Sequence, residues 1–398
     1  MTMPAASSAR PDAAHPGAAS RDAAARTDAG ARSEALSSRL SGTVRIVGAG
    51  LLGASIGHAL RAAGVDVALE DTSPAQLSLA VDYGAGRAAT AQDRPTLIVV
   101  AVPPDVVADV VERELRTHPG VVVTDVASVK LEPLRTLRER GVDLTHYIGS
   151  HPLAGRERGG AISARADIFV GRPWVVCRDA ETPAADLALV ESLALELGAM
   201  PLEMTPEDHD RSVALVSHVP QLVASLLAGR FTDAADGSLR LAGQGVRDTT
   251  RIAASAPELW VQILSANAAP VVDVLDQLSV DLARVADALR APDAPGARRE
   301  VADTIRRGNE GVERLPGKHG QNRRFATMVV MVDDTAGQLG RLFGDLGELG
   351  VNVEDLRLEH SPGAPFGLAE VSVVPAALHG AAEGLEQRGW KIASTSND

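Results

Sequence analysis

The 398-residue sequence predicts an α/β domain with a doubly wound parallel sheet, followed by an all-helical domain and a small α+β domain. Three observations predict this order. A glycine-rich turn follows the first β-rich run, continuous apolar runs then alternate with helical patterns, and the middle of the chain is almost entirely helical. The parts that we expect are a disordered leader (1–42), the sheet domain (43–182), the helical domain (183–310), a linker (311–324) and the small domain (325–398).

The first predicted strand leads into the glycine-rich turn. The β-rich run Thr43–Val47 is followed by Gly-Ala-Gly-Leu-Leu-Gly at residues 48–53 and then by a helical pattern. In such a turn Gly48 permits the bend, Gly50 lets the backbone approach a pyrophosphate, and Gly53 lets the helix pack close to the strand. Strand, turn and helix together predict a Rossmann-type fold that binds a dinucleotide at the helix N-terminus.

An acidic residue follows the second predicted strand, Val65–Leu69. Asp71 is placed to bond the ribose 2′-hydroxyl of the cofactor, and its charge would repel a 2′-phosphate. The sequence therefore favours NAD, with NADP as the alternative. The candidate cofactor-binding residues are Gly48, Gly50, Leu51, Leu52, Gly53, Asp71 and Val102.

Two polar residues follow later strands of the same sheet. Ser128 comes just after the apolar strand Val121–Asp125, and His151 comes just after the shorter strand His146–Gly149. Ligands of open α/β sheets bind at the carboxyl ends of the strands. A histidine with an ordinary pKa of about 6.5 can take the proton of a hydroxyl whose carbon gives hydride to a nicotinamide. We interpret the two signals together as a dehydrogenase with His151 as general base.

Composition argues against several other classes. The formal net charge is −13 and no basic patch is interleaved with aromatic residues, which argues against nucleic-acid binding. We find no run of about 18 apolar residues and no apolar h-region in the leader, so we expect no membrane span, no secretion and a cytoplasmic protein. The single cysteine, Cys177, lies in an apolar run and is expected to be buried. No histidine or cysteine spacing predicts a metal site.

The two later domains have distinct patterns. Residues 268–289 carry too apolar a stripe for a solitary helix, so we expect packing against a partner subunit in a homodimer. Residues 325–394 predict the order strand, helix, strand, strand, helix, strand. This is the ferredoxin-like order.

The motifs over about residues 43–310 resemble the prephenate/arogenate dehydrogenase family of tyrosine biosynthesis. They are the glycine turn with its two leucines, Asp125-Val-Ala-Ser-Val-Lys130, His151-Pro-Leu-Ala-Gly155 with Glu157 and Gly160, Ser217-His-Val-Pro-Gln221, Arg247-Asp-Thr-Thr-Arg-Ile-Ala253 and Trp260. The C-terminal unit resembles an ACT domain, a small amino-acid-binding regulatory module, with its ligand loop at residues 334–339. The departures are Ala127 in place of a frequent glycine, and Thr335-Ala336 in place of the usual proline before Gly337.

The resemblance implies an NAD(P)-dependent oxidative decarboxylation. Hydride leaves the hydroxyl-bearing carbon of a cyclohexadienyl ring, the ring carboxylate leaves as CO2, and the ring becomes aromatic. By the resemblance, His151 accepts the hydroxyl proton, Ser128 hydrogen-bonds both the hydroxyl and His151, and Arg251 holds the ring carboxylate. The other implied substrate-binding residues are His218, Gln221, Glu157, Arg247 and Trp260.

The residue at position 221 bears on the choice of substrate. Family members that use prephenate often carry histidine there, whereas Gln221 resembles the members that use arogenate. A neutral amide can accept from an ammonium group and donate to a carboxylate, so we lean towards arogenate without excluding prephenate. The ACT-like unit implies an amino-acid effector, tyrosine by family analogy.

Several alternatives stay open from the sequence. The structural roles to be weighed are a helix cap for Ser128, a solvated charge for Lys130, a loop histidine for His151, a core side chain for His218 and Trp260, and a surface ion pair for Glu157 and Arg247. A different β-hydroxyacid-type dehydrogenase would be expected to use a lysine of its second domain, yet Lys130 is the only lysine before residue 318. A non-enzymatic sensor of NAD and an amino acid is the other rival.

Overall fold

The computed structural model describes residues 39–155, 160–178, 182–235, 237–315, 325–360 and 365–397. The chain divides into two compact units, Met1–His218 with Ser255–Val271, and Val219–Ala254 with Val272–Asp398. Of the expected leader, residues 1–38 lie outside the described residues. Leu40 is buried in the core of the first unit, and Thr96 Oγ1 donates to the Ser41 carbonyl at 2.7 Å. The folded unit therefore begins before the predicted boundary at residue 43.

An eight-stranded sheet forms the centre of the first unit. Its strands are β1 (Thr43–Val47), β2 (Asp66–Glu70), β3 (Arg87–Ala88), β4 (Pro95–Val100), β5 (Val122–Asp125), β6 (Tyr147–Pro152), β7 (Pro173–Cys177) and β8 (Met200–Met204). The spatial order is β3-β2-β1-β4-β5-β6-β7-β8, and all neighbours run parallel except β6 and β7. The chain reverses its direction of travel across the sheet between β1 and β4, which is the switch point at which open α/β sheets bind ligands.

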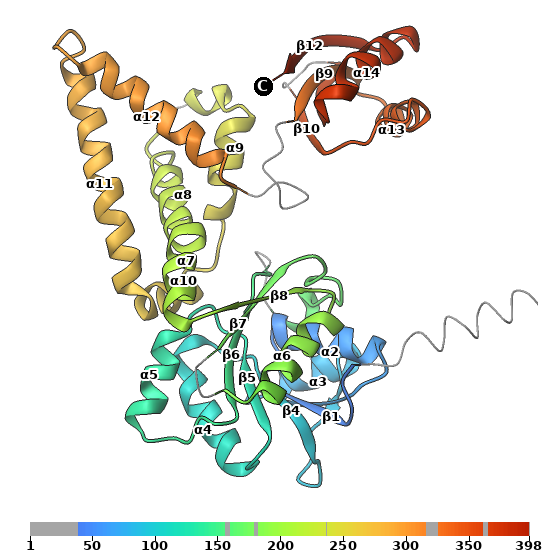
Figure 1. The fold of residues 1–398 in the computed structure, drawn as a ribbon, viewed down its shortest axis with the longest axis vertical. Helices are drawn as coiled ribbons and strands as arrows, with labels where there is room; N and C mark the ends of the chain where they lie inside the picture. The colour runs from blue at the N-terminus through green and yellow to red at the C-terminus, as the bar shows by residue number, and fades with distance from the viewer. Residues whose placement is uncertain are drawn as a thin grey trace, which may run out of the picture. The chain divides into compact units, whose positions relative to one another are not determined.

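Helices cover both faces of this sheet (Figure 1). They are α2 (Leu51–Ala62), α3 (Pro74–Asp82), α4 (Val107–Thr117) after the 3-10 turn η1 (Pro104–Val106), α5 (Leu131–Glu139), α6 (Ala184–Glu196) and α7 (Pro206–Val213), with a further 3-10 turn η2 (Ala161–Ser163). The helix α10 (Pro257–Ala266) packs against η1. One core joins Val44 and Ile46 to α2 and α6, and the other packs Val47 and Ile98 against α4 and α5. The doubly wound prediction is confirmed. The predicted boundary at residue 182 is wrong, because β8 is a strand of the same sheet and α6 packs into the core of the same unit.

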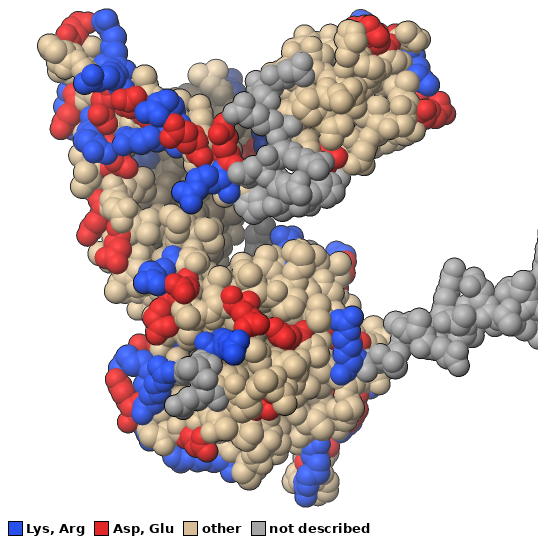
Figure 2. Space-filling model, in the orientation of Figure 1, with Lys and Arg blue, Asp and Glu red and all other residues tan. Residues whose placement is uncertain are grey.

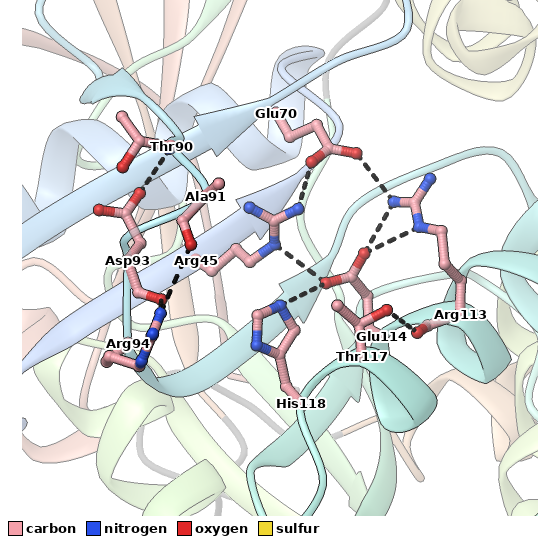
Figure 3. A network of polar contacts seen from close by, with 10 residues as sticks. All are labelled: Arg45, Glu70, Thr90, Ala91, Asp93, Arg94, Arg113, Glu114, Thr117 and His118. Atoms are coloured by element: carbon pink, nitrogen blue, oxygen red, sulfur yellow. Dashed lines mark hydrogen bonds and ion pairs between the residues drawn. The ribbon is translucent and has the colours of Figure 1, made fainter.

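A charged network ties the first strand to its neighbours (Figure 3). The Arg45 side chain on β1 is 11% exposed, donates from Nε to Glu114 at 2.9 Å, and also pairs with Glu70. Glu114 on α4 is buried and accepts a second guanidinium bond from Arg113 at 2.8 Å. A buried carboxylate needs such donors to offset its lost hydration. The network therefore holds α4 on the sheet and fixes the end of β2.

The second unit contains most of the helices expected beyond residue 206. They are α8 (Val219–Gly229), the 3-10 turn η4 (Ser238–Leu241), α9 (Gln244–Thr250), the 3-10 turn η5 (Arg251–Ala253), α11 (Ala268–Arg290), whose first turn belongs to the first unit, and α12 (Ala297–Val312). The helix α12 extends two residues into the segment predicted as linker, and residues 316–324 lie outside the described residues. On the face drawn in Figure 2, acidic and basic side chains are intermixed along α11 and α12, as in the Arg306–Glu310 pair at 2.6 Å.

Apolar side chains of α11 form an exposed stripe. They recur at positions 275, 278, 282, 285 and 289, with the alternating spacing of three and four residues that is typical of paired helices. Leu278, Leu282 and Leu289 are 41%, 67% and 62% exposed. An exposed apolar stripe of this length favours a surface that packs against another chain.

One long helical stretch corrects an expectation from the sequence. Residues Pro206–Gly229, made of α7, the π-helical turn η3 (Ala214–His218) and α8, are long and apolar enough to cross a membrane by length and composition. The most apolar window has a mean hydropathy of 1.5, and 33% of it is buried. The expectation that the chain has no such run is therefore wrong. One such helix is weak evidence for a span, since core helices can have the same length and composition.

The end of the chain folds as a four-stranded antiparallel sheet with two helices. The elements in order are β9 (Ala326–Asp333), α13 (Gln338–Glu348), β10 (Asp355–His360), β11 (Phe366–Val373), α14 (Pro375–Gln387) and β12 (Lys391–Asn397). Their spatial order is β10-β11-β9-β12. Alternate residues of β9 and β11 are buried against the two helices, and Trp390 Nε1 donates to Asp345 at 2.7 Å. The order of elements is the one that the sequence predicts.

Candidate active site

The turn between β1 and α2 is crowded at two glycines and open at the third. Gly48 has a φ of 103°, and a Cβ there would lie 2.3 Å from the Ala101 carbonyl oxygen. A Cβ at Gly53 would lie 1.9 Å from the Gly48 carbonyl oxygen, whereas one at Gly50 would have nothing within 4 Å. Gly50 is also the N-cap of α2, so the positive end of the helix dipole meets that open space. This is the arrangement that a pyrophosphate needs.

Asp71 lies beside the same turn. Its Oδ2 accepts from Ala49 N at 2.7 Å, and its Oδ1 accepts from Ser73 N at 2.8 Å. Two backbone donors thus fix the carboxylate next to the glycines, and each oxygen keeps a lone pair that a ribose hydroxyl can use. Val102 borders the turn too, because its Cγ1 lies 3.2 Å from the position of a Cβ at Gly48. The structure places at this switch point Gly48, Gly50, Leu51, Leu52, Gly53, Asp71 and Val102.

A buried group of charged residues follows β5. Lys130 is 2% exposed, pairs through Nζ with Asp125, and donates to the Ser150 carbonyl at 2.7 Å. The Tyr147 hydroxyl donates to Asp125 Oδ2 at 2.8 Å. Burial, together with that carboxylate, raises the pKa of Tyr147 well above its ordinary value, so the phenol stays protonated. The hypothesis that Lys130 is a solvated charge is wrong, because its side chain is buried and bonds Ser150, which precedes His151 on β6.

His151 is half-buried near the end of β6. Its Nδ1 lies 2.9 Å from Nε2 of His209, whose ring is fully buried. Burial in the first place, and then the neighbouring His209, Lys130 and His218, hold the pKa of His151 well below its usual value of 6.5. The imidazole is therefore neutral at neutral pH, which is the form that a general base requires.

Ser128 lies in the loop between β5 and α5. The bond between Ser128 and His151 that the resemblance implies is not formed in the described part of the chain, where Nδ1 of His151 bonds His209 instead. Ser128 does not cap α5 either. That helix begins at Leu131, and Asp210 of α7 accepts from Lys130 N and Leu131 N, both at 2.9 Å. The cap alternative for Ser128 is wrong, because a carboxylate from another helix satisfies these donors.

A second buried histidine, His218, ends the π-helical turn η3. Asn267 Nδ2 donates both to the Asp210 carbonyl at 2.8 Å and to His218 Nδ1 at 3.0 Å. Because Nδ1 accepts, the proton of the neutral ring lies on Nε2. Burial lowers the pKa of His218 to about 4, which keeps the ring neutral. The Trp260 ring meets it edge to face at 6.1 Å between centroids. His218 thus offers an oriented N–H donor.

Three further candidates lie in the second unit. Gln221 on α8 is buried and donates from Nε2 to Ser225 at 3.4 Å. Arg247 on α9 and Arg251 on η5 are exposed. The helix α8 packs against η5, so Gln221 and Arg251 belong to one helical body. The remaining candidate, Glu157, lies outside the described residues.

His209, Asp210 and Asn267 also belong to the candidate site, and the sequence did not indicate them. The available signal was a histidine beside an aspartate on α7, a few residues before the Ser217–Gln221 motif. No spacing relates this pair to His151, because α7 and β6 meet only in the folded unit. A buried acid that caps another helix leaves no trace in local sequence.

Comparisons with known proteins agree on one family. The family model described as prephenate dehydrogenase, nucleotide-binding domain, matches residues 56–202, and that of the prephenate dehydrogenase dimerization domain matches residues 205–302. A probable prephenate dehydrogenase of Streptomyces niveus, NovF, is 38% identical over 356 residues, which cover 87% of this chain and 98% of that protein. A cyclohexadienyl dehydrogenase of Zymomonas mobilis is 32% identical over 63% of this chain and 89% of that protein.

Solved structures have the same fold. The arogenate dehydrogenase of Synechocystis is 27% identical, with a TM-score of 0.55 over 68% of this chain and 99% of that chain. The prephenate dehydrogenase of Aquifex aeolicus is 24% identical, with a TM-score of 0.61 over 69% of this chain and 99% of that chain. Fold and glycine turn define a nucleotide-binding α/β protein with a helical dimerization domain. The chain belongs to the prephenate dehydrogenase family.

The glycine turn yields a paired prediction. Gly50→Ala adds a methyl group in open space, so we expect wild-type stability and NAD affinity weakened about tenfold or more. Gly53→Ala drives a methyl group into the Gly48 carbonyl and should cost about 1–3 kcal/mol of unfolding free energy. Thermal unfolding and NAD titration measure both effects. NAD affinity unchanged in Gly50→Ala, or unchanged stability in Gly53→Ala, would contradict the geometry.

Proposed function

We propose that this chain catalyses the NAD-dependent oxidative decarboxylation of prephenate, arogenate or both, in the biosynthesis of tyrosine. Family membership supports the reaction class, and the relatives include a cyclohexadienyl and an arogenate dehydrogenase. The observation that carries the proposal in this chain is a neutral His151 in a sheet domain whose glycine turn and Asp71 are suited to a dinucleotide.

The residues at the switch point are suited to NAD. When bound, NAD accepts the hydride that leaves the hydroxyl-bearing carbon of the substrate. Gly50 and the start of α2 would receive the pyrophosphate, and Asp71 would bond the ribose hydroxyls. The fixed negative charge of Asp71 disfavours a 2′-phosphate, which supports NAD over NADP.

His151 is proposed to take the hydroxyl proton at its Nε2, because its Nδ1 is bonded to His209. Loss of that proton strengthens the push of electrons towards the carbon that gives up hydride, and departure of CO2 leaves an aromatic ring. Ser128 is proposed to bond the same hydroxyl, and the Nε2–H of His218 to hold a substrate oxygen. Arg251 would position the ring carboxylate rather than accelerate its loss. Tight binding by Arg251 would stabilise the carboxylate, which must leave as CO2.

Substrate choice is proposed to depend on Gln221. Its amide can accept from the ammonium group of arogenate and donate to a carboxylate, so it tolerates a zwitterionic side chain. This supports use of arogenate and leaves prephenate as the second substrate to assay.

We also propose that the C-terminal sheet is an ACT-like domain of ferredoxin-like fold. The element order and the spatial order β10-β11-β9-β12 support the fold. Gly337, with a φ of 91°, is the N-cap of α13 and lies in the loop expected to receive an effector. Tyrosine is the proposed effector, as an inhibitor of its own synthesis. A cytoplasmic location accords with a biosynthetic enzyme of this family.

The exposed stripe of α11 is proposed to pack against a second copy of the chain, in line with the match to a dimerization domain. Leu282→Glu places a charge in this stripe and should shift the protein from dimer towards monomer at micromolar concentration. Leu195→Glu, at an exposed apolar site of α6, is the matched control and should leave the mass unchanged. Sedimentation or light scattering measures the mass. An unchanged Leu282→Glu dimer would exclude the stripe from the interface.

The catalytic assignment predicts the effect of removing the imidazole. His151→Asn should lower kcat about 100-fold or more, because general-base help is lost, while NAD affinity stays at the wild-type value. Wild type and variant are assayed with prephenate and with arogenate, each with NAD and with NADP. A variant that turns over as fast as wild type would remove His151 from the mechanism. Wild-type activity on prephenate alone would reject the preference inferred from Gln221.

The position of the acid limb of kcat/KM is a further prediction. Proton acceptance needs the neutral imidazole, and a lowered pKa keeps His151 neutral at more acidic pH. The rate should therefore be constant around pH 6.5 and fall only as the pH drops through the lowered pKa. Initial rates across the range of pH in which the protein stays folded test this. An acid limb centred at 6.5 or above contradicts it.

A further inference from the structure

Three buried or half-buried side chains form a chain of hydrogen bonds in the first unit. His151 Nδ1 lies 2.9 Å from His209 Nε2, and His209 Nδ1 lies 2.7 Å from Asp210 Oδ1. His209 and Asp210 are both fully buried on α7, whereas His151 is half-buried on β6. The line runs from the proposed base into the interior and ends at a carboxylate.

The direction of each bond follows from what each atom can do. A carboxylate only accepts, so the proton of His209 lies on Nδ1 and points to Asp210. In the tautomer whose single proton lies on Nδ1, His209 has a lone pair at Nε2. His151 must donate to that lone pair from Nδ1–H. The Nε2 of His151 is left with the lone pair that a proton acceptor needs.

The carboxylate at the end of the line is itself held in place. Asp210 Oδ1 accepts from Lys130 N and Oδ2 accepts from Leu131 N, both at 2.9 Å. Asn267 bonds the backbone carbonyl of the same residue at 2.8 Å. Because backbone donors and a helix N-terminus fix the acid, it cannot turn without breaking the start of α5. Because His209 Nδ1 is bonded to this fixed carboxylate, the orientation of the His209 ring is fixed too.

We propose that His209 and Asp210 form a positioning dyad that fixes the tautomer and the orientation of His151, so that its Nε2 lone pair is presented to the substrate hydroxyl. The inference rests on the proposed role of His151 as base. When His151 takes the proton, it gains a second N–H, and its Nδ1–H stays bonded to His209. The ring thus keeps its orientation while it holds the proton, because the bond from Nδ1–H to His209 is not broken.

Two substitutions of His209 distinguish a role in positioning His151 from a role in the stability of the fold. His209→Asn puts an amide where Nδ1 stood, which keeps a donor to Asp210 and removes the acceptor for His151. His209→Gln reaches the place of Nε2 and can offer an amide oxygen to His151. We expect kcat to fall about 10- to 100-fold in the Asn variant with KM and NAD affinity unchanged, and to recover most of that loss in the Gln variant.

A control and a spectroscopic measurement complete the test. His146→Asn also removes an imidazole paired with a carboxylate, Asp186 at 2.7 Å, and should leave kcat unchanged. In wild-type protein with 15N-labelled histidine, Nε2 of His151 should have the chemical shift of an unprotonated nitrogen at neutral pH, and Nδ1 that of a protonated one. This readout needs neither a stable variant nor turnover.

Each outcome supports or overturns the dyad. Protonated Nε2 on His151 in the wild type, or equal kcat in folded His209→Asn and wild type, would overturn it. Equal loss in the Asn and Gln variants would assign His209 a merely structural role. If His151→Asn is fully active while the wild-type tautomer is as stated, the base assignment fails and the positioning geometry stands.

Discussion

The buried carboxylate of Asp210 is the contact on which the geometry of the candidate site depends. It accepts from the two backbone N–H groups that begin α5 and from His209, while its own backbone carbonyl accepts from Asn267. An ionised carboxylate in the interior is costly unless donors surround it, and here they come from several elements. Removing the acid would release the start of α5 and the ring of His209 together. Asp210 therefore fixes both the start of α5 and the ring of His209 in the candidate site.

A second buried pair fixes the strand that carries His151. Lys130 bonds the carbonyl of Ser150 and pairs with Asp125, so it joins the ends of β5 and β6 from within. Lys130 thus fixes the residue that precedes His151, and His209 holds the ring of His151. Both neighbours, together with burial, keep the ring neutral. The contacts that fix the position of His151 are therefore also among those that keep its imidazole neutral.

The sequence predicted the sheet domain well because its signals are local. Glycines that need a positive φ or close backbone approach, such as Gly48 and Gly53, leave an unambiguous pattern, and apolar runs of β4 and β5 identify parallel strands. The boundary at residue 182 failed because the pairing of strand β8 with β7 is a long-range contact that no local pattern indicates. The apolar stretch Pro206–Gly229 was overlooked because polar residues such as His209 and His218 interrupt it.

The candidate site was predictable only in part. His151 and the glycine turn follow from position at strand ends, and the structure places them in one unit. The partner of His151 was predicted as Ser128 and proves to be His209, because a tertiary contact between α7 and β6 decides it. The roles of Gln221, Arg247 and Arg251 stay predictions, as does that of Glu157. Local pattern identifies the residue types, and long-range packing decides which of them meet.

The central claim is that buried neighbours keep His151 neutral and ready to accept a proton. Its titration midpoint in the folded protein tests this most directly. It can be read by NMR from the ring carbon Cε1 of labelled histidine and assigned by its disappearance in His151→Asn. The account predicts a midpoint well below 6.5. A midpoint at 6.5 or above would contradict it.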